Sequence, residues 1–265
     1  SVDSLECLTA FLKEDFEFVY INTVASGKFF NIIEQHSLKL TGSIVTHIHE
    51  MERILAEFDD EMQLILEKTD LYISASPASS KTLIEKYEIP EVLVTTVAAF
   101  INPVAELDVS SEELRQQVRN QFSIAQDAFV ITGCGTLYWR KGADIFIETA
   151  RIVRALTTKD IAFIWIGDGP DRADLEASLT EKDRQFIKFI GNHKNANELT
   201  AMADVFYMSS REDPFPLVVL EAAQHAIPSI CFDEATGITE FVKYNSGSII
   251  EKINPLEAAN AVITY

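Results

Sequence analysis

The sequence has few cysteines, no excess of positive charge and no apolar run of transmembrane length. Its three cysteines, Cys7, Cys134 and Cys231, lie far apart without metal-ligand spacing, so we expect reduced thiols in a cytoplasmic protein. The formal charge of −19 argues against nucleic acid as a partner. Residues 1–105 hold 7 Lys and Arg against 17 Asp and Glu, so membrane contact by this half is not expected.

The chain also shows no signal peptide and no initiator methionine, which indicates a processed or excised piece. What it does have is 47% hydrophobic residues, enough for globular cores in two modest domains across 265 residues.

Apolar strands alternate with helical stretches along both halves of the chain. This alternation predicts βαβ units, and hence parallel sheets covered on both faces. Six strands after residue 129 predict a nearly complete doubly wound domain. A polar and acidic linker beginning at Asn102 and Pro103 separates the two halves. The expected strands are 16–21, 42–47, 71–75, 92–97, 129–132, 161–166, 186–190, 205–208, 229–232 and 248–250, and the expected helices are 5–14, 27–36, 50–58, 60–68, 79–87, 111–121, 142–156, 171–179, 196–202, 217–225, 237–243 and 255–264.

The stretch from Ser209 to Glu221 follows a predicted buried strand and leads into a predicted helix. Pro214 and Pro216 interrupt the chain between them, and Pro216 is suited to a first helical turn. Free backbone N–H groups at a helix start attract phosphate oxygens. Asp213 and Glu221 can accept hydrogen bonds from hydroxyls. The stretch therefore suits a ligand that carries both phosphate and sugar hydroxyls.

A second phosphate-type turn runs from Gly133 to Gly142 and carries Arg140 and Lys141. It lacks the Lys-Ser/Thr of a P-loop, and an ordinary strand-to-helix turn with solvated basic residues is the alternative. The Gly-Asp-Gly-Pro segment at 167–170 fails as a dinucleotide fingerprint because Arg172 takes the third glycine's place. We expect a tight structural turn there.

These segments resemble the donor site of family 4 retaining glycosyltransferases, within glycosyltransferase group 1, which have the GT-B fold of two Rossmann-like domains. The resemblance is carried by 209–228 and 236–240, and Gly135, Lys141 and Gly142 match the spacing of the family's first turn. It extends over nearly the whole second half and over the later part of the acceptor-side domain in the first half. Asp213 stands where Glu is usual and Thr136 where Arg is usual. The fold class implied is α/β with two doubly wound parallel sheets: residues 1–103 as a partial acceptor-side domain without its first glycine-rich loop, and 104–265 as the nucleotide-sugar domain.

The resemblance also implies roles for single residues. Asp213 would hold the donor sugar and Glu221 the ribose. His49 would lie near the reacting centre, and His47 would either support His49 or simply pack in the core. His193 would lie near the base, although a plain surface histidine is the alternative. The full donor-binding set is Gly135, Arg140, Lys141, Pro214, Phe215, Pro216, Glu221, Glu240 and His193, with Asp213 and His49 as catalytic residues and no metal or cofactor.

The function implied is transfer of a hexosyl unit, with retention, from a nucleotide-diphosphate sugar to a carbohydrate or lipid-linked acceptor in glycan or cell-surface polysaccharide synthesis. A non-catalytic nucleotide-sugar-binding module, or an inactive fragment of a larger glycosyltransferase, is the first alternative. A doubly wound interaction domain without a ligand is the second.

Overall fold

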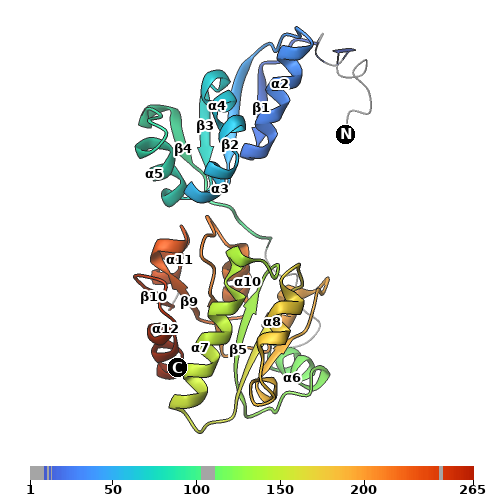
Figure 1. Cartoon of the computed structure of the whole chain (residues 1–265), viewed down its shortest axis with the longest axis vertical. Coiled ribbons are helices and arrows are strands. Elements are labelled where there is room, and N and C mark those ends of the chain that lie inside the picture. Colours follow the sequence, from blue (N-terminus) through green and yellow to red (C-terminus); the bar gives the residue numbers. More distant parts are fainter. Residues whose placement is uncertain (1–8, 11, 13, 103–110, 245–246) are drawn as a thin grey trace. The chain divides into compact units, whose positions relative to one another are not determined.

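The computed structural model describes residues 9–10, 12, 14–102, 111–244 and 247–265. It divides the chain into two compact units, Ser1–Ala99 and Phe100–Tyr265 (Figure 1). Each unit contains one parallel sheet with connecting helices, which confirms the predicted α/β class. The helix predicted at 5–14 lies mostly outside the described residues, and the predicted domain boundary after residue 103 adjoins a second undescribed stretch, 103–110.

The first unit is a four-stranded sheet in the order β1-β2-β3-β4, with all neighbours parallel. Helix α5 begins two residues earlier than predicted, because Ser76 caps it and Pro77 occupies its first turn. Its elements are β1 (Phe18–Asn22), η1 (Val24–Gly27), α2 (Lys28–Gln35), β2 (Ser43–Ile48), α3 (Glu52–Glu57), α4 (Asp59–Lys68), β3 (Leu71–Ser74), α5 (Pro77–Glu85), η2 (Glu91–Leu93) and β4 (Val94–Thr96).

The prediction that this first sheet is covered on both faces is wrong for the described residues. Its strand order never reverses, and right-handed crossovers that all step in one direction place every connecting helix on one face. Buried residues of all four helices accordingly pack in one cluster with Ile21, Ile48 and Tyr72. The other face includes Phe18 and Leu71, which are 61% and 47% exposed.

The second unit is a six-stranded parallel sheet in the order β10-β9-β8-β5-β6-β7. Here the direction of the crossovers reverses at β5, which puts helices on both faces. Its elements are α6 (Ser111–Gln121), β5 (Phe129–Cys134), η3 (Trp139–Lys141), α7 (Ala143–Leu156), β6 (Ile161–Ile166), α8 (Arg172–Ser178), η4 (Asp183–Gln185), β7 (Ile187–Phe189), α9 (Ala196–Thr200), β8 (Val205–Met208), α10 (Leu217–Gln224), β9 (Ser229–Phe232), η5 (Asp233–Ala235), α11 (Thr239–Tyr244), β10 (Ser248–Ile250) and α12 (Pro255–Thr264).

Alternate residues of each central strand enter different cores of this second unit. Trp165 and Tyr207 pack with α7 and α12 on one face, where Phe146 contacts both rings. Ile164 packs toward α6 and α9, and Phe206 toward α10 and α11, on the opposite face. Strands buried on both sides explain the continuous apolar runs seen in the sequence.

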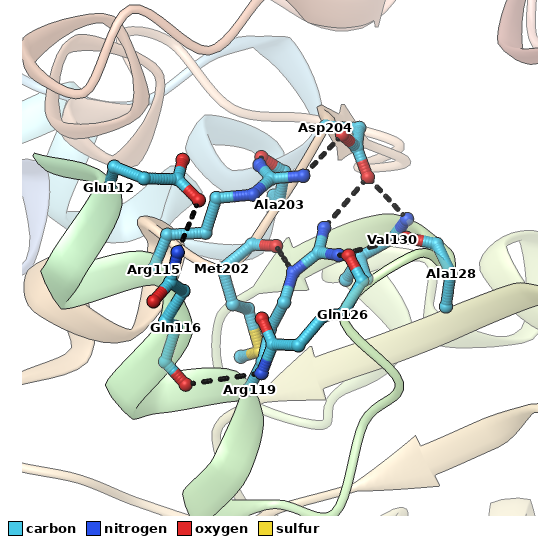
Figure 2. A network of polar contacts seen from close by, with 10 residues as sticks. All are labelled: Glu112, Arg115, Gln116, Arg119, Gln126, Ala128, Val130, Met202, Ala203 and Asp204. Carbon is cyan, nitrogen blue, oxygen red and sulfur yellow. Dashed lines mark hydrogen bonds and ion pairs between the residues drawn. The ribbon is translucent and has the colours of Figure 1, made fainter.

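A buried ionic network closes the amino end of this sheet (Figure 2). Arg119 of α6, whose side chain is 0% exposed, donates to the backbone oxygens of Met202, Gln126 and Ala128. Its remaining nitrogen lies 2.9 Å from Asp204, just before β8. Asp204 also accepts from Arg115 at 2.6 Å and from the Val130 N–H at 2.7 Å. The network therefore ties α6 to the starts of β5 and β8.

Candidate nucleotide-sugar site

The reversal in strand order lies between β5 and β8, which pair directly through Ile131 with Val205 and Thr132 with Phe206. In open α/β sheets, ligands bind outside the carboxyl ends of the strands at such a switch point. The two segments singled out in the sequence leave these two strands, 135–142 after β5 and 209–216 after β8.

The turn after β5 depends on glycine at two positions. Gly135 has φ 151° and Gly142 has φ 67°, values that side-chain-bearing residues rarely adopt. A Cβ atom at Gly142 would also lie 2.0 Å from the Ser209 backbone oxygen. Gly142 therefore lets the turn bend into α7 while the loop after β8 packs directly against it.

The loop after β8 is held by backbone hydrogen bonds on both sides. The Arg211 N–H donates to the Arg140 oxygen at 2.8 Å, and the Asp213 N–H donates to the Ala235 oxygen at 2.7 Å. Asp213 also pairs with Thr236 in an isolated parallel bridge. The loop is therefore fixed between the turn after β5 and the segment after β9.

This packing brings together two residues that the sequence analysis placed in one site. The Lys141 ammonium forms an ion pair with the Asp213 carboxylate, and the two side chains are 18% and 10% exposed. Arg140 donates to the Glu212 backbone oxygen at 2.7 Å, so its guanidinium also lies against the loop after β8. Two cations and one carboxylate thus gather at the switch point.

Glu221 comes from the second turn of α10 and is half-buried, and burial raises its pKa. Burial raises the pKa of the Cys134 thiol to about 11, and the charge of Glu221 adds to this rise, so Glu221 lies near the end of β5. The helix begins at Leu217, as predicted, and Pro216 is its N-cap residue, with an extended ψ of 106°, instead of lying within the first turn.

The other predicted donor residues have supporting or peripheral positions. Pro214 accepts from the Gly237 N–H at 3.0 Å, and Phe215 packs against the core beneath α10 and α11. Glu240 is exposed in the first turn of α11. His193 contacts the Ile190 oxygen at 2.9 Å and the edge of Phe122, so its ring supports the loop after β7.

In the first unit, His49 lies at the end of β2 and its Nε2 is 2.7 Å from Asn22 Oδ1, at the end of β1. Glu50 joins the two strand ends, since it accepts from the Thr23 hydroxyl and from the N–H groups of Val24 and His49. Thr23 has φ 70°, a strained value for a β-branched residue.

His47 lies beside His49, with ring centroids 3.8 Å apart, as strand alternation predicted. Its Nδ1 contacts the Tyr20 hydroxyl. Burial, aided by the neighbouring His49, lowers the pKa of His47 to about 4, so this ring is neutral at physiological pH. Within the described ranges, no three His, Cys, Asp or Glu residues are grouped to hold a metal ion.

Sequence reasoning missed Arg211, Asp144 and Asn22. Arg211 binds Asp144 in the first turn of α7, and Asn22 contacts His49. Arg211 stood inside the stretch already singled out, so its position was a signal. Asp144 and Asn22 contact residues that are distant in sequence, and the residues next to them in the chain form no motif that predicts those contacts.

Comparison with known proteins agrees with this geometry. The structure aligns with the crystal structure of Anabaena Alr3699/HepE in complex with UDP at a TM-score of 0.77, 19% identity, and coverage of 98% of this chain and 71% of that chain. The same protein in complex with UDP-glucose aligns at a TM-score of 0.79 with 20% identity, over 97% of this chain and 70% of the other. The chain therefore has the GT-B glycosyltransferase fold.

The profile of the family described as Glycosyl transferases group 1 matches residues 128–265, and the chain belongs to this family. It is 28% identical over 152 residues to the alpha-galactosylglucosyldiacylglycerol synthase of Streptococcus pneumoniae (strain ATCC BAA-255 / R6), a match covering 55% of this chain and 39% of that protein. It is 26% identical over 155 residues to the putative teichuronic acid biosynthesis glycosyltransferase TuaC of Bacillus subtilis (strain 168), covering 58% and 37%. The matches thus span less than half of either relative. No helix among the described residues has the length and apolar character to cross a bilayer.

Proposed function

We propose that this chain binds a nucleotide-diphosphate sugar, with a uridine diphosphate sugar as the first candidate, and takes part in retaining transfer of its hexosyl unit. The observation that carries this proposal is the Lys141–Asp213 pair at the switch point of the second sheet. It combines a cation suited to phosphate with a carboxylate suited to sugar hydroxyls. HepE binds UDP and UDP-glucose on the same fold, which supports this donor class.

In the proposed reaction, the bond between the anomeric carbon and the diphosphate oxygen breaks, and its electron pair leaves with the diphosphate. Lys141 and Arg140 stabilise the charge that develops there, a role that protein cations fill without a metal ion. The acceptor oxygen bonds to the anomeric carbon from the same face, and its proton passes to the departing diphosphate. Asp213 holds the sugar hydroxyls and Glu221 the ribose.

The remaining assignments follow the family resemblance. Glu240 supports the segment between sugar and phosphate, and His193 is assigned to the base. His49 orients an acceptor hydroxyl or a donor phosphate oxygen, with Asn22 holding its ring. The proposed acceptor is a carbohydrate or lipid-linked glycan in the cytoplasm, a class supported by the names of the glycolipid and teichuronic acid relatives.

A second candidate function is donor binding without transfer by this chain. It is favoured by the coverage of the relatives, since the matching segments span 39% and 37% of two glycosyltransferases. Saturation-transfer NMR and thermal unfolding with a panel of nucleotide sugars test donor binding in either case. Failure of every nucleoside diphosphate and nucleotide sugar to bind would overturn both candidates, and release of free sugar from a bound donor would favour the enzyme.

A further inference from the structure

Arg211 belongs to the loop after β8, and it makes three contacts with the turn after β5 and a further pair with the first turn of α7. Its guanidinium pairs with both carboxylate oxygens of Asp144, at 2.8 and 2.6 Å. It donates to the Trp139 backbone oxygen at 2.8 Å and lies over the Trp139 ring, 4.8 Å from the ring centroid. Its own N–H donates to the Arg140 oxygen at 2.8 Å.

We propose that Arg211 is a positioning residue of the nucleotide-sugar site, acting through Lys141. Lys141 ends the turn that the guanidinium holds, and Asp213 follows Arg211 by two residues. Arg211 therefore sets the distance between the cation and the carboxylate, and it fixes the place where the ammonium meets a diphosphate. The inference rests on the proposed function, because it names how the same site is ordered.

The geometry requires arginine at this position. A guanidinium can bind a carboxylate with two parallel hydrogen bonds, donate to a carbonyl and stack on an aromatic ring at once. A lysine ammonium at 211 would keep the charge but would lose this fork and the contact of the guanidinium carbon with the Trp139 ring. The turn needs such a restraint because Gly135 and Gly142, which flank it, are conformationally permissive residues.

The ionisation of Asp144 favours a lasting ion pair with Arg211, which we call the clamp. Burial pushes the pKa of Asp144 upward, but the hydrogen bonds and charge of Arg211, together with hydrogen bonds from the backbone N–H groups of Asp144 and Ile145, hold the pKa below its usual value. Asp144 therefore remains an anion, and the pair remains intact, at neutral pH. The Arg211 side chain is 20% exposed and the Asp144 side chain 54% exposed, so water screens the pair from the Asp144 side.

The test is a double-mutant cycle with UDP as the probe, measured by calorimetry on the whole chain below its unfolding temperature. Lys141→Ala should weaken UDP binding roughly 10- to 150-fold, the range for a charged hydrogen bond. Arg211→Lys should weaken it about tenfold in the unchanged chain, but less than about twofold in the Lys141→Ala background. Equal losses in both backgrounds, or no loss in either, would overturn the positioning role.

Arg151→Lys is the matched control, because Arg151 makes a comparable pair with Asp183 from the third turn of α7. It should leave UDP affinity unchanged, and a loss equal to that of Arg211→Lys would count against the proposal. If Arg211→Lys does not fold, Asp144→Asn takes its place, since it weakens the same pair from the other side. Its loss should likewise vanish in the Lys141→Ala background.

A spectroscopic signature separates the clamp from general loosening. Trp139 is 39% exposed and Trp165 is 1% exposed, so acrylamide quenches mainly Trp139. Arg211→Lys should increase this quenching and Arg151→Lys should not, whereas unchanged quenching in Arg211→Lys would contradict the stacked arrangement. Absence of binding of UDP and of every other nucleoside diphosphate by the unchanged chain would instead refute the proposed function, and that result is visible before any variant is made. If another nucleoside diphosphate binds and UDP does not, that nucleotide becomes the probe in the same cycle.

Discussion

Lys141 and Asp213 form an ion pair across 72 residues of sequence, at the point where the second sheet reverses its strand order. Each is the other's counter-charge, so a substitution at either residue changes the electrostatics of its partner. Because the pair is mostly shielded from water, this coupling is stronger than that of a surface salt bridge. The effects of the two residues on ligand binding are therefore best interpreted together.

We expect Lys141→Ala to weaken UDP binding by about 1.5–3 kcal/mol, the scale for hydrogen bonds to charged groups. The loss should lie toward the upper end, because Asp213 would then face the diphosphate without its cation. Calorimetry measures the change. Lys159→Ala, just before β6 at the opposite end of the sheet, is the control. An unchanged dissociation constant for Lys141→Ala would remove this residue from the site.

The network at the amino end of the second sheet should support stability without affecting donor binding. Asp204→Ala leaves the Arg119 guanidinium buried and unpaired, so we expect a loss of about 3–5 kcal/mol in unfolding free energy. Arg115→Ala removes a partly exposed partner and should cost about 1 kcal/mol. Both tryptophans lie in the second unit, so urea unfolding followed by their fluorescence reports this unit alone. Equal losses for the two variants would contradict the burial argument.

His47 should titrate near pH 4 instead of near 6.5, and it should stay neutral throughout the physiological range. Its folded pKa is lower than its unfolded pKa, so its contribution to stability is present above pH 6.5 and is lost as pH falls toward 4. NMR titration of the imidazole protons gives the midpoint. His49→Gln removes the neighbouring charge and should raise that midpoint. A His47 midpoint at 6.5 in the unchanged chain would disprove the burial argument.

Much of the second unit could be predicted from sequence because its strands are short apolar runs between clear breaks. The predicted ranges 205–208, 229–232 and 248–250 coincide with β8, β9 and β10. Strand β4 is shorter than predicted, since residues 91–93 form a 3-10 turn that apolar content alone does not reveal. The uncovered face of the first sheet depends on strand order, which local pattern does not encode.

The site was predictable to the level of segments but not of contacts. Lys141 and Asp213 each stood in a recognisable turn, yet their pairing follows from the neighbouring positions of β5 and β8. The clamp between Arg211 and Asp144 has the same origin. Local sequence identified the strand ends that carry ligand-binding residues, whereas the topology of the sheet decided which strand ends meet.

The division of roles between Asp213 and Glu221 tests the central claim that this site binds a nucleotide-diphosphate sugar. Paired calorimetric titrations with UDP and with a UDP-sugar that the unchanged chain binds should be run on Asp213→Asn and Glu221→Gln. Asp213→Asn should weaken binding of the UDP-sugar, because it removes the carboxylate that accepts from the sugar hydroxyls. It should not weaken binding of UDP, because there it only frees Lys141 from its ion pair. Glu221→Gln should weaken both ligands by a similar factor, on the order of 1–3 kcal/mol. Equal loss of both ligands in Asp213→Asn, or loss of the UDP-sugar alone in Glu221→Gln, would contradict the account.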